Sequence, residues 1–226
     1  MTTLHTNSLL FALTAWATLA WSVAQAADGT RYVSTTGNNA NACTLAAPCR
    51  SLQRGIDRTP EGGELRILDS GFYGTNAMIR KSLTIAGNGN TIYLGSPLAI
   101  NGAGAVVALR GLVLNGQGAA QDGIVVTSAA AVHVEHCVVH GFAQEGIDVD
   151  AGSGTNVFVT GSTVRDNDVG LEVSITTTTR ISNSIFTGNK TGIVIGSGAV
   201  VETRGNNIVR GNTTNVVGTL TPFGGI

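Results

Sequence analysis

Acidic residues gather in one part of the sequence, where they could do chemistry. Residues 122–172 carry eight acids and one base, Arg165, whereas the whole chain of 226 residues has a formal net charge of −1. Side chains alternate along a strand, so Asp148 and Asp150 would share the outer face of one strand, with Glu172 beside Asp148 one repeat later. Neighbouring carboxylates repel one another, so these three would retain a proton, bind a cation such as Ca²⁺, or extend into water.

Each state of these carboxylates predicts a different role. A retained proton would supply a general acid next to a general base, as in glycosidic bond cleavage, which makes Asp148, Asp150 and Glu172 candidate catalytic residues. The same three residues are candidate Ca²⁺ ligands, and no other cofactor is expected. A solvated group would be only an acidic surface. A lyase also needs a nearby base, but Arg165 and Lys190 are expected on another sheet and in a turn, which favours a binding protein over an enzyme.

Three histidines and a cysteine form a second cluster in the sequence. His133, His136, Cys137 and His140 have the residue types of a zinc site. Strand alternation sends His133 outward between apolar neighbours, so we expect the four side chains to diverge rather than to converge on a metal. The valines after Cys137 indicate a buried thiol.

The elements that position these residues follow from a repeat of 22 to 24 residues. At this spacing a glycine recurs before an apolar strand, at Gly123, Gly146, Gly170 and Gly192. Strands at this period, without helices, are typical of a parallel β-helix, whose stacked coils share one apolar interior. Leucine-rich repeats, the main alternative, require a recurrent leucine framework and a helical segment. We therefore predict an all-β parallel β-helix. The residues expected to point inward are Ile124, Val126, Ile147, Val149, Leu171, Val173, Ile193 and Ile195.

Asparagines recur at nearly the same spacing and predict a structural ladder. Asn167, Asn189 and Asn212 would stack at one turn of successive coils, where asparagine tolerates the left-handed backbone conformation and bonds to nearby backbone. The first half of the chain fits the pattern less regularly, and residues 61–226 would form roughly seven coils at about 23 residues each. A short helix over residues 51–58 would cap the first coil, and Phe223 is the candidate plug at the other end.

The beginning of the chain predicts export. An uncharged apolar run is followed by the small residues Ala24-Gln25-Ala26, so residues 1–26 are predicted to be a signal peptide rather than a membrane anchor. In an oxidising compartment Cys43 and Cys49 would form a disulfide, within an N-terminal segment of residues 27–60 that includes the capping helix. The processed protein is expected to be periplasmic or secreted, without a membrane span. The net charge of −1 offers no basic surface for nucleic acid.

Residues 31–57 contain a strand, a Gly/Asn turn, a cysteine pair and the capping helix, in the segments RYVS, GNNANAC and PCRSL. Together with the repeats, this order resembles right-handed parallel β-helix proteins of the pectate-lyase-like superfamily, particularly small exported bacterial members. The resemblance implies a right-handed coil and relatives that include pectate lyases and polygalacturonases. The polygalacturonase pattern of paired Asp, Gly-His-Gly and Arg-x-Lys is absent.

The sequence thus predicts a protein that binds an extended polymer, a polysaccharide or cell-surface glycan, on its acidic face. One alternative is a lyase or glycoside hydrolase of acidic polysaccharide. Another is a structural protein that associates through the open end of its solenoid.

Overall fold

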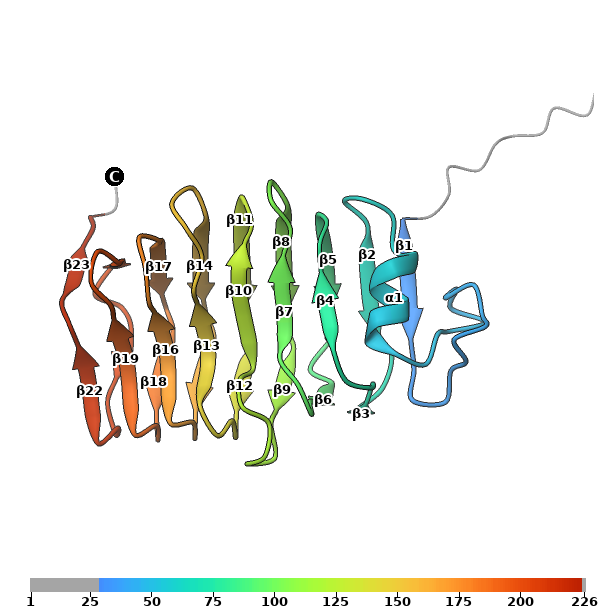
Figure 1. Cartoon of the computed structure of the whole chain (residues 1–226). Coiled ribbons are helices and arrows are strands. Elements are labelled where there is room, and N and C mark those ends of the chain that lie inside the picture. The colour runs from blue at the N-terminus through green and yellow to red at the C-terminus, as the bar shows by residue number, and fades with distance from the viewer. Residues whose placement is uncertain (1–28, 225–226) are drawn as a thin grey trace, which may run out of the picture.

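Three parallel sheets run along the whole solenoid in a computed structural model that describes residues 29–224 (Figure 1). Each coil contributes one strand to each sheet in a fixed order, which we number sheet 1, sheet 2 and sheet 3. Seven complete coils follow one another, from β2–β3–β4 to β20–β21–β22, which confirms the predicted fold class and coil number. The predicted signal peptide, residues 1–26, lies outside the described residues.

The strands of each sheet are hydrogen-bonded in the order in which they occur along the chain. Sheet 1 consists of β1 (Thr30–Val33), β2 (Glu64–Ile67), β5 (Leu83–Ala86), β8 (Val106–Arg110), β11 (Ala131–Glu135), β14 (Asn156–Thr160), β17 (Thr178–Ser182), β20 (Val200–Thr203) and β23 (Leu220–Pro222). Sheet 2 consists of β3 (Gly71–Phe72), β6 (Thr91–Tyr93), β9 (Val113–Asn115), β12 (Val138–His140), β15 (Thr163–Arg165), β18 (Ile185–Thr187) and β21 (Ile208–Val209). Sheet 3 consists of β4 (Ala77–Ile79), β7 (Leu98–Asn101), β10 (Ile124–Ser128), β13 (Glu145–Val149), β16 (Val169–Val173), β19 (Thr191–Ile195) and β22 (Thr214–Val217).

The core is a column of aliphatic side chains inside the coils. Of the eight residues predicted to point inward, seven are fully buried, and Ile195 is only partly buried against the core. Equivalent residues are stacked in register, as in the pair Ile147 and Leu171. Burying one such side chain stabilises the fold by roughly 1.5–3 kcal/mol.

The repeated glycines occupy places where two coils come too close for any side chain. A Cβ atom on Gly170 would lie 2.5 Å from the carbonyl oxygen of Gly192 and 2.9 Å from Nδ2 of Asn189. A Cβ atom on Gly192 would meet Nδ2 of Asn212 at 2.7 Å. Each of these glycines thus lies against the asparagine of the next coil. The glycine repeat and the asparagine repeat therefore arise from the same contact between coils.

The asparagine ladder forms as predicted between sheets 2 and 3. Asn167 donates from Nδ2 to Oδ1 of Asn189 at 3.0 Å, and Asn189 donates in the same way to Asn212 at 3.1 Å. Each Oδ1 also accepts the backbone N–H one coil earlier, from Phe142 onward. The ladder therefore satisfies buried polar groups that no water reaches, because Asn167 and Asn189 are 5% and 3% exposed.

The conformation predicted for the ladder asparagines was wrong. The left-handed residues stand one position earlier in each coil, where φ is 73° at Gly141, 59° at Asp166, 68° at Gly188 and 71° at Gly211. The chain turns at these residues, and the asparagine that follows each of the last three points into the solenoid.

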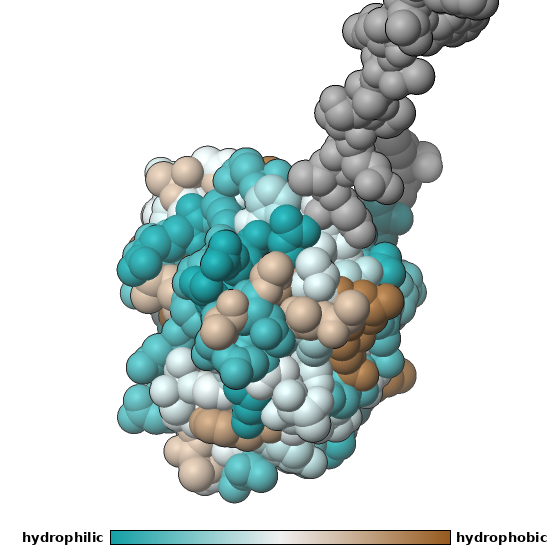
Figure 2. Space-filling view, turned by 90° about the vertical axis from the view of Figure 1, so that its right-hand side faces the viewer, coloured by the Kyte–Doolittle hydropathy of each residue, from teal (hydrophilic) through white to brown (hydrophobic). Residues whose placement is uncertain are grey.

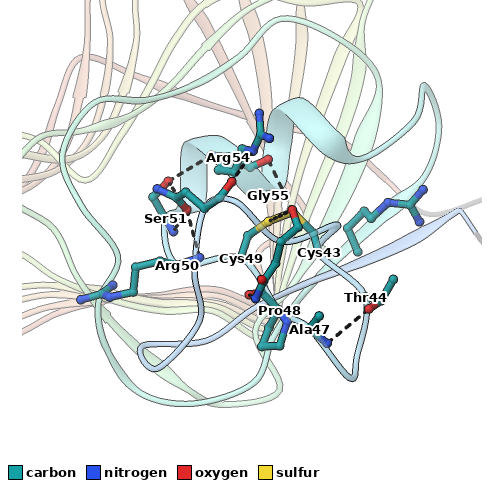
Figure 3. Close-up of a disulfide and its surroundings, with 12 residues drawn as sticks. Cys43, Thr44, Ala47, Pro48, Cys49, Arg50, Ser51, Arg54 and Gly55 are labelled. Atoms are coloured by element: carbon teal, nitrogen blue, oxygen red, sulfur yellow. Dashed lines mark hydrogen bonds between the residues drawn. A yellow bond between two sulfur atoms is a disulfide. The ribbon is translucent and has the colours of Figure 1, made fainter.

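The N-terminal end of the solenoid is covered by helix α1 (Leu52–Arg58) and a disulfide loop. Leu52 and Ile56 are buried against the first coil, and Ser51 caps the helix by accepting the N–H of Arg54. The predicted Cys43–Cys49 disulfide is present beside the helix (Figure 3), and its loop is hydrogen-bonded to Tyr32 of β1. This end shows a mostly hydrophilic surface with a few separate hydrophobic areas (Figure 2).

The last coil is less well covered. The inward residues Val209 of β21 and Leu220 of β23 are only partly buried, whereas their register partners Phe186 and Val201 are fully buried. Phe223, the predicted plug, is only partly buried, and the guanidinium carbon of Arg204 lies 5.3 Å from the centre of its ring. Phe223 therefore packs beneath an arginine instead of filling the core.

Replacing Asn189 by alanine should lower the free energy of unfolding by about 2–4 kcal/mol, because buried backbone groups lose their partners on both sides. Asn206→Ala is the matched control, since Asn206 bonds to Asn183 in the same side-by-side manner on the exposed surface. The control should cost less than about 1 kcal/mol. Urea unfolding followed by circular dichroism measures both changes. Equal losses of unfolding free energy would show that the buried ladder stabilises the fold no more than the exposed asparagine pair does.

Candidate functional site

Sheet 3 carries the predicted acidic face on its outer side. Asp148 on β13 lies directly opposite Glu172 on β16 in the strand register, and both side chains are partly buried. Asp150 is exposed and lies just after β13, where its N–H donates to the carbonyl of Val126 at 3.0 Å. The structure thus pairs two of the three predicted residues within the sheet and leaves the third at its margin.

Two further carboxylates join this group, Asp122 and Glu145. The N–H of Glu145 donates to Oδ1 of Asp122 at 3.3 Å, which holds the two carboxyl groups close together. Strand alternation alone puts Glu145 on the inner side with Ile147. However, Gly146 and Ile147 are both buried, so the alternation breaks at the glycine and Glu145 comes to the surface. The available signal was the acid before the repeated glycine in two successive repeats, at Asp122-Gly123 and Glu145-Gly146.

Burial and mutual repulsion favour the protonated form of two of these groups. Partial burial and the hydrogen bond and charge of Asp122, with smaller effects of Glu172 and Asp148, raise the pKa of Glu145 to about 8. Partial burial, followed by the charges of Asp122, Asp150 and Glu172, raises the pKa of Asp148 to about 6. The face therefore holds acidic protons close to neutral pH.

The outer row that contains Asp148 and Glu172 is apolar on both sides of them. In register, this row passes from sheet edge to sheet edge through Met78, Ala99, Val125, Asp148, Glu172, Val194 and Val217. At about 4.8 Å per strand, the row is about 29 Å long. It offers small apolar contacts at its two ends and a pair of hydrogen-bonding carboxyl groups in the middle.

The basic residues considered with the acidic face lie elsewhere. Arg165 is on β15 of sheet 2, paired with Asp166, and Lys190 contacts Asp168 with 3.2 Å between Nζ and Oδ1. Neither side chain belongs to the outer row of sheet 3.

The histidines and the cysteine occupy separate places. His133 lies on β11 of sheet 1, His136 is a left-handed turn residue with φ 53°, and His140 lies on β12 of sheet 2. Cys137 is a buried free thiol, and burial is the main reason why its pKa rises to about 11. Within residues 29–224, no three His, Cys, Asp or Glu side chains are grouped so that they could hold a metal ion. The assignment of Asp148, Asp150 and Glu172 to Ca²⁺ stays a prediction.

Comparison with known proteins identifies the coils. A family model described as a right handed beta helix region matches residues 64–214, which begin with the first complete coil. Neither the curated proteins nor the solved structures include a significant match. Among the described residues, no helix has the length and apolar character needed to cross a membrane.

The raised pKa of Glu145 predicts how stability depends on pH. The folded pKa of about 8 lies above the ordinary value of 4.5, so the stabilising effect of the proton is complete below pH 4.5 and is lost as the pH rises towards 8. Asp148 adds a similar loss between its ordinary value of 3.8 and about 6. The free energy of unfolding should therefore fall between pH 6 and 8, and Glu145→Gln should remove most of that fall.

Chemical denaturation at closely spaced pH values tests this expectation. Asp168→Asn is the control, because it removes one surface carboxylate that lies outside the group. A fall between pH 6 and 8 that persists unchanged in Glu145→Gln would assign the proton to another residue.

Proposed function

The chain belongs to the right-handed β-helix family, and on that premise we propose that it is an exported protein that binds an extended polysaccharide along the outer row of sheet 3. The observation that carries the proposal is the composition of this row, in which Asp148 and Glu172 are flanked by apolar side chains on successive coils. A polymer lying parallel to the solenoid axis would meet apolar side chains towards both ends of the row and the two carboxyl groups in its middle.

The chemistry of a sugar chain matches this row. The C–H faces of sugar rings are apolar and pack on residues such as Val125 and Val194, while the hydroxyl groups donate to carboxylates. Glu145, with a pKa of about 8, keeps a proton at neutral pH and can donate to a sugar oxygen. Donors and acceptors are thus both present, as a hydroxyl-rich ligand requires.

We also propose that the protein is exported and that it is a member of the pectate-lyase-like superfamily. The Cys43–Cys49 disulfide is compatible with an extracellular location, because such bonds persist in oxidising compartments. The resemblance of residues 31–57 and of the coils to exported β-helix proteins supports a periplasmic or secreted protein that meets polysaccharide or a cell-surface glycan.

The proton-holding carboxyl groups favour hydrolysis as a second candidate function. A protonated Glu145 or Asp148 would donate its proton to the glycosidic oxygen, while a neighbouring carboxylate would take a proton from the attacking water. A lyase is less well supported, because Arg165 and Lys190 are paired with other acids away from the row.

Replacing Asp148 and Glu172 together should weaken polysaccharide binding at least tenfold. The double variant Asp148→Asn/Glu172→Gln keeps the shape of both side chains and removes their charge. Asp166→Asn/Asp168→Asn removes the same number of charges outside the row and should bind like the wild-type protein. Affinity electrophoresis against neutral and uronic acid polysaccharides, with calcium and with a chelator, measures the difference.

The outcomes of this experiment separate the alternatives. Equal affinity of the two double variants would remove the outer row as the binding surface. Binding that disappears with the chelator would instead assign Ca²⁺ to Asp148, Asp150 and Glu172. We expect no release of reducing ends or of unsaturated uronides from any polymer, and release that stops in Asp148→Asn/Glu172→Gln would establish an enzyme.

A further inference from the structure

The outer face of sheet 1 carries a stack of rings that ends abruptly. His133 on β11 and Phe158 on β14 are register partners, and their rings lie nearly parallel, 4.8 Å apart with 5° between the planes. On the far side of Phe158, the guanidinium carbon of Arg180 lies 5.5 Å from the ring centre. One face of the His133 ring is therefore covered by Phe158.

The opposite face of the His133 ring is not covered by another ring. The register partner of His133 on that side is Ala108 on β8, and Thr84 on β5 follows in the same row. Beside these two short side chains lies a hollow of about 350 Å³, lined by residues of β5, β8 and β11. Ala108 lines this hollow next to the His133 ring and is itself only 8% exposed.

The rim of the hollow carries both hydrogen-bond donors and acceptors. Arg110 donates from Nε to Oε2 of Glu135 at 2.7 Å, and the Arg110 side chain is 57% exposed. Nδ1 of His133 lies 3.9 Å from Oε1 of Glu135, and Ser82 and Thr84 line the other side. The charges of Arg110 and Glu135 balance each other, so the rim is polar without a net charge.

We propose that this hollow binds one pyranose ring of a neutral glycan, stacked on the free face of His133. The apolar C–H face of a sugar ring fits a flat ring, and the sugar hydroxyls around its edge fit the paired donor and acceptor of Arg110 and Glu135. The volume lies at the lower end of the range for small-ligand sites.

The neighbouring groups select against other occupants. Because Arg110 and Glu135 neutralise each other, the rim offers no net positive charge to hold an anionic sugar, and an unsubstituted aromatic ring would leave the polar rim without partners. The site is on sheet 1 and shares no residue with the row on sheet 3, so it does not depend on the function proposed for that row.

Nuclear magnetic resonance of the purified protein tests the site directly. The ring protons of His133 are followed, among only four histidines in the chain, while cellopentaose, xylopentaose or mannopentaose is added. We expect at least one of these probes to shift the His133 resonances in the wild-type protein and equally in Asp148→Asn/Glu172→Gln. The second protein separates this site from the row on sheet 3.

Two variants remove the site by different means. Ala108→Phe fills the hollow with a ring that continues the stack, so the variant should fold and bind the active probe at least tenfold more weakly. His133→Ala should weaken binding to a similar degree by removing the stacking surface. Thr178→Phe adds the same ring to β17, outside the hollow, and should leave binding unchanged.

The proposal fails if none of the neutral probes shifts His133, or if Ala108→Phe binds as tightly as the Thr178→Phe control. It also fails if trigalacturonate or p-cresol shifts His133 while the neutral probes do not, because the occupant would then be an anion or an aromatic group.

Discussion

The distance between neighbouring coils is the constraint on which the rest of this structure depends. Backbone hydrogen bonds hold parallel strands about 4.8 Å apart, and the register pairs each residue with its equivalent on the next coil. Every outward or inward row therefore repeats one type of contact at a fixed spacing. The buried aliphatic rows, the asparagine ladder and the ring stack all use this spacing to bring like groups into favourable contact.

The same spacing is unfavourable for the two carboxyl groups in the outer row of sheet 3. Asn167 and Asn189 gain hydrogen bonds from being one coil apart, and His133 and Phe158 gain a stacked contact. Partial burial is the main cause of the raised pKa of Asp148, the charges of Asp122 and Asp150 follow, and repulsion from Glu172 one coil away adds to them. The same spacing thus stabilises the neutral rows and adds repulsion between the two carboxyl groups of the outer row.

Much of this arrangement is readable from the sequence where the repeats are regular. The positions of Gly170 and Gly192 predict the coils, and the spacing of Asn189 and Asn212 predicts the ladder. Glu145 was missed because alternation assumes an unbroken strand, while the close approach of the next coil requires Gly146 and shifts the preceding residue outward. The hollow beside His133 could not be predicted, because it requires Ala108 to be the register partner of His133, and the repeats before residue 123 are too irregular to give that register.

The acidic row is the part of sheet 3 that folding does not require. Val125 and Val194 occupy the equivalent outward positions on neighbouring coils, so the fold accepts an apolar side chain there. Replacing Asp148 and Glu172 by similar residues would remove repulsion and partial desolvation of charge without disturbing the core. The raised pKa values of Glu145 and Asp148, together with the lack of a folding role for Asp148 and Glu172, support the binding surface proposed for this face. On sheet 1, the short side chain of Ala108 next to the His133 ring is part of the hollow for which a separate glycan site is proposed.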